Sequence, residues 1–143
     1  MTASSETGVA AALLAAALLT CSSGESCVEV SPATCTPLYA PAYSEVFART
    51  LKPACGQGTT SCHAAAGAQG GLVFADADAS YEMLTATSPR TGRPRITAGN
   101  AGCSLLVTRL ESTRADVQMP PGAPLSAGER CAIERWIQDG AAR

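Results

Sequence analysis

Apolar side chains recur at helical intervals in four stretches of the chain. The first stretch begins at Tyr43 and is expected to form a helix that ends at Pro53, because proline disrupts a helix interior. The second helix is expected to begin near Asp76 or Asp78, because either carboxylate can cap a helix N-terminus. The apolar positions are Tyr43, Val46, Phe47 and Leu51 in the first helix and Tyr81, Met83 and Leu84 in the second.

The other two stretches lie in the second half of the chain. One predicted helix covers residues 103–110. The last helix begins with Ser126 and Glu129, which match the S-x-x-E capping box, and Gly140 is expected to end it. Its apolar stripe is Ala132, Ile133, Trp136 and Ile137. Because no segment alternates convincingly between apolar and polar residues, the pattern predicts a mostly-α fold of about four helices with long loops.

An unbroken apolar run at residues 9–19 precedes these helices. It is too short for the ~20 residues of a membrane-spanning helix and is typical of a secretory signal. The run ends at Leu19 and is followed by Thr20 and Cys21, and this arrangement resembles a bacterial lipobox. We therefore expect residues 1–20 to be a lipoprotein signal peptide and lipidated Cys21 to hold the mature chain at the membrane of the cell envelope, facing the periplasm or exterior. Ordinary secretion and an unprocessed tail are the alternatives.

Composition narrows the class of protein. A net charge of −2 removes the general attraction to phosphates, so the sequence does not favour nucleic-acid binding. Only 4% of the residues are aromatic, which is little material for a core, whereas there are seven cysteines. A domain of this kind needs covalent staples or a bound cofactor.

The cysteines divide into one plus six if Cys21 carries the lipid. Six cysteines in an oxidising compartment suggest complete pairing, although the number alone allows 15 connectivities. Cys27 and Cys35 flank a short Ser/Pro/Thr segment and are expected to close a small disulfide loop. Residues 21–41 have the turn-rich composition of a tether, which leaves residues 42–143 as the functional domain.

The segment after the first helix carries the strongest chemical motif. Cys55 and Cys62 are followed directly by His63, the arrangement that attaches haem c through two thioethers and holds an imidazole under the iron. Six residues separate the cysteines, where the usual motif has two, so the small and polar insert GQGTTS must bulge out. The alternative is a Cys55–Cys62 disulfide beside a surface histidine.

The sequence also offers a candidate for the second axial ligand of such a haem. Met119 lies in a proline-stiffened loop (QMPPG) just before the last predicted helix, where an apolar thioether has no periodic reason to be. The alternative role for Met119 is to pack the loop onto that helix. Met83, in contrast, lies on an apolar helix face and is expected to belong to the core.

Further short motifs follow the Cys-His pair in order. They are residues 70–72 (GGL), Tyr81 and Leu84 (Tyr-x-x-Leu), residues 104–106 (SLL), residues 119–122 (MPPG) and residues 136–141 (Trp-Ile-x-x-Gly-Ala). From about Val46 to Ala141 this ordered set resembles the planctomycete-type cytochrome c domains that also occur in predicted myxobacterial lipoproteins. The resemblance implies a small class I cytochrome c-like bundle with haem c bound by Cys55 and Cys62, His63 as proximal ligand and Met119 as distal ligand.

The resemblance also implies a function and further roles. The chain would be a monohaem electron carrier, not an enzyme, that exchanges single electrons with redox partner proteins. Cys103 and Cys131 would form a disulfide across the Met119 loop, unless one of them pairs with Cys55 or Cys62. The apolar residues expected to keep the haem dry are Phe47, Leu106 and Trp136.

Other chemistries are less well supported. A zinc site is disfavoured because the chain has one histidine, and a Cys-His hydrolase is disfavoured because adjacent residues rarely face each other. The basic loop with Arg90, Arg93 and Arg95 is expected to be a solvated surface, or else to pair with haem propionates or an acidic partner. The remaining alternative is a haem-free, disulfide-stapled lipoprotein that acts as a structural or interaction module, which would need neither the Cys-His pair nor Met119.

Overall fold

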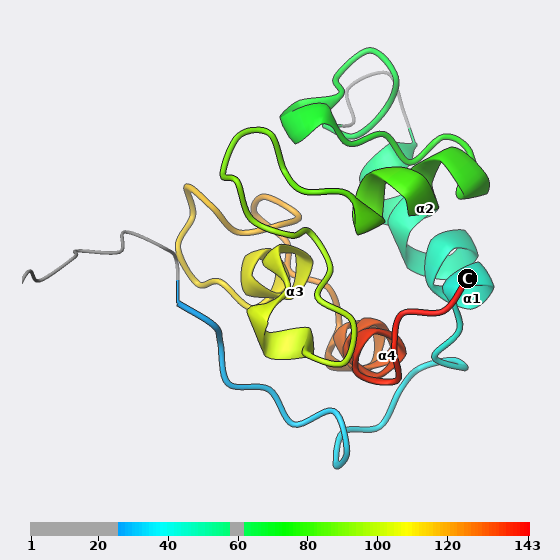
Figure 1. Cartoon of the computed structure of the whole chain (residues 1–143), viewed down its shortest axis with the longest axis vertical. Helices are drawn as coiled ribbons and strands as arrows, with labels where there is room; N and C mark the ends of the chain where they lie inside the picture. The colour runs from blue at the N-terminus through cyan, green and yellow to red at the C-terminus, as the bar shows by residue number, and fades with distance from the viewer. Residues whose placement is uncertain (1–25, 58–61) are drawn as a thin grey trace, which may run out of the picture.

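The computed structural model describes residues 26–57 and 62–143, and it is mostly helical (Figure 1). The only β pairing in these two ranges is an isolated bridge between Thr87 and Pro94. The prediction of a mostly-α fold of about four helices is therefore confirmed. The α-helices are α1 (Tyr43–Val46), α2 (Ala77–Thr85), α3 (Leu105–Leu110) and α4 (Ala127–Gln138), joined by the π-helix η1 (Phe47–Gly56) and the 3₁₀-helices η2 (Gln69–Gly71) and η3 (Ala101–Cys103).

Local capping explains where α2 and α4 begin. The Asp76 carboxylate accepts hydrogen bonds from the backbone N–H groups of Asp78 and Ala79, at 3.0 and 2.9 Å. At α4, Ser126 and Glu129 form the reciprocal capping box that the sequence predicts. Both caps satisfy backbone donors that have no partner inside the helix, so these two helix starts follow from sequence alone.

An aromatic cluster lies where α1 meets α4. The ring of Tyr43 lies 5.0 Å from that of Tyr81 and 5.3 Å from that of Trp136, measured between centroids. Phe47 is 6.0 Å from Tyr43 on the same side of the helix. Four of the six aromatic residues are thus concentrated in one place, where they form part of the core. The aliphatic part of that core includes Val46, Leu51, Leu84, Val107, Ile133 and Ile137.

Residues 26–41 form a strap that crosses α3 and α4 on the outside (Figure 1). The backbone N–H of Val28 donates to the Gly102 carbonyl at 3.0 Å. The strap and η3 approach each other so closely that a Cβ on Gly102 would lie 2.3 Å from the Val28 carbonyl oxygen, so only glycine fits there. Further along, Arg135 of α4 donates to the carbonyl oxygens of Pro32 and Cys35 at 2.6 and 2.8 Å. This turn-rich segment is therefore packed on the helices along its described length.

Two disulfides fasten the strap, and their pairing differs from the prediction. Cys27 is bonded to Cys103, and Cys35 is bonded to Cys131, in place of the expected Cys27–Cys35 and Cys103–Cys131 pairs. The physical reason is the path of the strap, which brings Cys27 to η3 and Cys35 to α4. The bonds join residues 76 and 96 positions apart, and closing such long loops stabilises the fold by about 4–5 kcal/mol each in the chain-entropy model.

Two carboxyl side chains meet between α3 and α4, one of them buried and the other partly buried. Glu134 of α4 is 7% exposed and hydrogen-bonds to Glu111, the residue that follows α3. Arg130 forms an ion pair with Glu111, with Nε and Oε1 2.5 Å apart. Burial is the main cause that raises the pKa of Glu134 to about 7, and the neighbouring Glu111 adds to it. Glu134 therefore holds a proton in the folded chain well above the pH at which an ordinary glutamate ionises.

None of the helices in residues 26–57 and 62–143 is long and apolar enough to cross a membrane. The predicted signal peptide and the predicted lipid-attachment residue, Cys21, lie outside the described residues.

Glu134→Gln is expected to change how stability depends on pH. The folded wild type binds the Glu134 proton more tightly than the unfolded chain, so its free energy of unfolding falls as pH rises from about 4.5 to about 7. The amide has no proton to lose, so the stability of the variant relative to the wild type should rise by up to about 3 kcal/mol between pH 4 and pH 8. Urea unfolding at both pH values measures this. The exposed Glu29→Gln is the control, and an equal difference at both pH values would contradict the assignment.

Candidate functional site

The first helix carries Cys55 further than the sequence predicts. Pro53 was expected to end it, but the helix continues through Pro53 as the π-helix η1 and ends at Gly56. Proline has no N–H to donate and its ring collides with the carbonyl four residues back in an α-helix. The wider hydrogen-bond register of a π-helix removes that conflict, and such turns are frequent at functional sites. As a result Cys55 lies in the last turn of η1.

Gly56 lets a second segment pack directly against this helix end. A Cβ on Gly56 would lie 2.5 Å from the carbonyl oxygen of Phe74, so any larger residue would push the two segments apart. Phe74 is 2% exposed and in turn donates its backbone N–H to the His63 carbonyl at 2.9 Å. The end of η1, His63 and Phe74 are therefore held as one unit.

His63 has its ring fixed by two contacts. Its Nδ1 is 3.1 Å from the carbonyl oxygen of Leu72, and since a carbonyl only accepts, Nδ1 carries the proton. The ring meets that of Phe74 edge-on, with centroids 5.4 Å apart. The backbone N–H of His63 also donates to the Cys55 carbonyl at 3.2 Å. No hydrogen bond joins Nε2 to another described residue, and with the proton on Nδ1 this nitrogen carries the lone pair of the ring.

Cys55 and Cys62 remain thiols outside both disulfides. Cys62 is exposed, whereas Cys55 is half-buried and packs against the core. Burial is the main cause that raises the pKa of Cys55 to about 11, and Glu129 and the nearby Cys62 add to it. The structure therefore brings together both cysteines and the histidine of the Cys-His motif. Residues 58–61 between the cysteines lie outside the described residues.

Met119 lies on a different loop from this cluster. Its backbone N–H donates to the Arg109 carbonyl of α3 at 3.0 Å, and its half-buried side chain packs against the core. In Figure 1 the Met119 loop, in gold and orange, lies beside α3, and the loop after His63 lies at the top of the view. The core packing matches the alternative role that the sequence leaves open for Met119.

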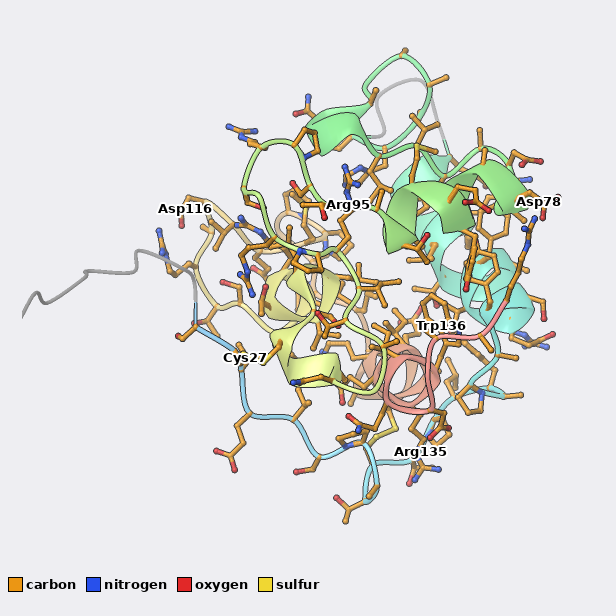
Figure 2. All side chains as sticks on the ribbon, viewed as in Figure 1. Cys27, Asp78, Arg95, Asp116, Arg135 and Trp136 are labelled. Carbon is orange, nitrogen blue, oxygen red and sulfur yellow. A yellow bond between two sulfur atoms is a disulfide. The ribbon has the colours of Figure 1, made fainter. Side chains whose placement is uncertain are left out.

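The solvated-surface prediction for the basic loop is wrong for one of its three arginines. Arg90 is exposed and Arg93 is half-buried, but Arg95 is only 7% exposed (Figure 2). The Arg95 guanidinium donates to the carbonyl oxygens of Gly70 at 2.9 Å and Met83 at 2.8 Å. Burial lowers the pKa of Arg95. Nothing in the local pattern distinguishes this arginine from its neighbours, because its partners are backbone atoms of distant segments.

Two hollows in the surface of the described residues lie away from the side chains of the candidate site. One, of about 660 Å³, lies between the strap turn and the C-terminal end of α4, and the other, of about 190 Å³, lies beside the start of α1. Neither is lined by Cys55, Cys62, His63 or Met119. In the part of the chain that the structure describes, no group of three or more His, Cys, Asp or Glu side chains is placed to hold a metal ion.

Comparison with known proteins adds no relative: no family model matches the sequence, and no curated protein or solved structure is significantly similar to it. The functional argument therefore depends on the residues themselves.

The two thiols are expected to react at very different rates with an alkylating reagent. In protein prepared without haem at pH 7, exposed Cys62 should react at least about tenfold faster than Cys55, whose raised pKa and burial suppress the thiolate. Peptide mass spectrometry after timed quenching measures both rates. Cys62→Ser should remove the fast reaction and leave the slow one. Equal rates, or no reaction at either residue because they are bridged, would contradict this arrangement.

Proposed function

We propose that this protein is a c-type-cytochrome-like electron carrier that binds one haem. In this proposal Cys55 and Cys62 attach the haem, Nε2 of His63 is the proximal ligand and the Met119 thioether is the distal ligand. The observation that carries the proposal is the hydrogen bond from His63 Nδ1 to the Leu72 carbonyl, at 3.1 Å.

That hydrogen bond is the arrangement that an axial histidine needs. Histidines that bind metals almost always donate their other ring N–H to a carbonyl or carboxylate, because this selects the tautomer and raises the basicity of the ligating nitrogen. Leu72 supplies the carbonyl, and Phe74 limits rotation of the ring from the side. A surface histidine without such a role would have no need of these two contacts.

The distribution of the cysteines supports the same proposal. The four other cysteines in the described part of the chain pair with one another, whereas Cys55 and Cys62 remain thiols. A thiol, not a disulfide, is the form that adds to a vinyl group: the S–H hydrogen goes to one vinyl carbon and sulfur bonds to the other, with no oxidant required. The raised pKa of Cys55 keeps it in that form at neutral pH.

A bound haem would supply one-electron chemistry by cycling between ferrous and ferric iron. The residues of the chain would set its environment. His63 would provide a basic nitrogen held by Leu72, and Met119 would provide a soft sulfur from a loop tied to α3. Phe47 and Trp136 are buried and Leu106 is partly buried, so each would limit the access of water from the core side. Protein redox partners and an envelope location through lipidated Cys21 belong to the same proposal.

A second candidate is a haem-free interaction module stapled by disulfides. The specific observation in its favour is that Trp136, only 2% exposed, packs against Tyr43 in the core, and that none of the ligand candidates lines either of the two hollows described above. The strap and its two disulfides would suffice to stabilise such a module. Haem content separates the two candidates.

Protein exported through a c-type maturation pathway is expected to be red. Its mass should exceed that of the processed chain by one haem, and the colour should survive extraction with acidic acetone, because thioethers are covalent. Cys55→Ser/Cys62→Ser should lose the haem on extraction, and each single variant should retain it through one bond. Colourless protein whose mass shows a third disulfide would reject the electron-carrier proposal in favour of the module.

Met119→Ala is expected to open the sixth coordination position of the haem protein. The reduced wild type should be low-spin and unreactive toward carbon monoxide, and the variant should bind it readily, because alanine offers no sulfur. Absorption spectra with and without the gas measure this. Met83→Ala is the matched control, since it removes a partly buried methionine from α2 without touching the proposed ligand set. An unchanged spectrum in Met119→Ala would remove this residue from the ligand set.

A further inference from the structure

We propose that Arg95 is the positioning residue for His63. Its guanidinium holds the turn at Gly70, and through this turn the Leu72 carbonyl, so that the His63 ring is fixed with Nε2 as its available nitrogen. The positioning role stands on contacts within the chain, and its consequence for a haem iron rests on the proposed function.

The contacts of Arg95 join segments that are distant in sequence. Nη1 donates to the carbonyl oxygens of Met83 at 2.8 Å and of Ala86 and Thr87 at 3.3 Å each, where α2 ends. Nη2 donates to the carbonyl of Gly70 at 2.9 Å, in η2. One planar side chain therefore ties the end of α2 to the loop that contains His63. Figure 2 shows Arg95 in the interior between α2 and η2.

The turn at Gly70 connects Arg95 to the histidine. Gly70 has φ +65° and Gly71 has φ +69°, conformations that side-chain-bearing residues rarely adopt, so the turn needs an external hold to keep one shape. The Gln69 N–H closes the other side of the loop by donating to the Cys62 carbonyl at 2.9 Å. Leu72, whose carbonyl accepts from His63, follows this turn directly. Movement of the Gly70 carbonyl would therefore displace the acceptor on which the ring orientation depends.

The chemistry of the site requires arginine. Among the described residues no carboxylate pairs with Arg95, and its guanidinium donates to four backbone carbonyls instead. A buried cation is tolerated only when such hydrogen bonds replace water. Arginine presents its donors in a rigid fork, whereas lysine offers a compact ammonium that cannot span carbonyls on two sides. A lysine at this position would keep the charge and lose the bridge.

The chain has a single histidine, so its ring can be followed without ambiguity by NMR of ¹⁵N-histidine-labelled protein. We would use the full exported protein with its disulfides intact and with any haem iron in the ferrous state. The quantity measured is the rate of solvent exchange of the His63 Nδ1 proton. In the wild type this proton should be protected. Arg95→Lys and Arg95→Gln should each exchange it about tenfold faster, because the acceptor turn opens more often. If haem is bound, both variants should also raise the reduction potential, because a weaker Nδ1 hydrogen bond makes the imidazole less basic.

Ser104→Ala is the control for general destabilisation. Ser104 is fully buried and its hydroxyl bonds to the backbone of Thr97 and Asn100, away from the His63 loop. This variant should lower the melting temperature and leave the exchange rate of the His63 proton unchanged. Equal acceleration in Ser104→Ala, or wild-type exchange in a folded Arg95→Lys, would overturn the proposal.

A wild-type measurement covers the case in which the Arg95 variants do not fold. The Arg95 Nη protons and the His63 Nδ1 proton should share one opening free energy over a range of temperatures. A His63 proton that exchanges while the Arg95 protons stay protected would refute the link. Haem content, measured on the same samples, reports on the electron-carrier proposal separately, because the exchange experiment gives its result with or without haem.

Discussion

The two disulfides of the strap are the constraint on which the rest of this structure depends. They join residues far apart in sequence, hold residues 26–41 across α3 and α4, and use four of the six cysteines of the described chain. A chain with few aromatic residues gains much of its stability from such bonds, because they restrict the unfolded ensemble. The same pairing keeps Cys55 and Cys62 out of both strap disulfides. The two disulfides therefore also determine which cysteines are available at the candidate site.

The site is built mainly from backbone contacts. Gly56 permits the close approach of Phe74. The Leu72 carbonyl accepts a hydrogen bond from His63, and the Gly70 carbonyl accepts one from Arg95. The Arg95 guanidinium and the Phe74 ring are the two side chains that support these backbone contacts around His63. Because the geometry depends on carbonyl positions in a loop with little regular structure, a buried guanidinium that ties this loop to a helix end has more influence here than an apolar contact would have.

Sequence patterns predicted the elements that local physics controls. The capping residues Asp76 and Ser126 mark the starts of α2 and α4, since the side-chain acceptor and the backbone donors lie within three residues of each other. Periodicity located the first and third helices for a similar reason. The end of the first helix was missed at Pro53, because the sequence rule that proline ends a helix applies to the α-helical register, and here the helix continues to Gly56 in a π-helical register.

By itself the sequence determined the mostly-α class, the helix starts and the adjacency of Cys62 and His63, because each depends on residues within one or two turns. Only the tertiary structure decided which cysteines pair, that Arg95 is buried, and that the His63 ring donates to Leu72. These features depend on contacts between segments that are far apart in sequence. Separation in sequence does not predict which of these segments lie close together in space. A local pattern can name the groups able to do chemistry, and long-range packing decides how they are oriented.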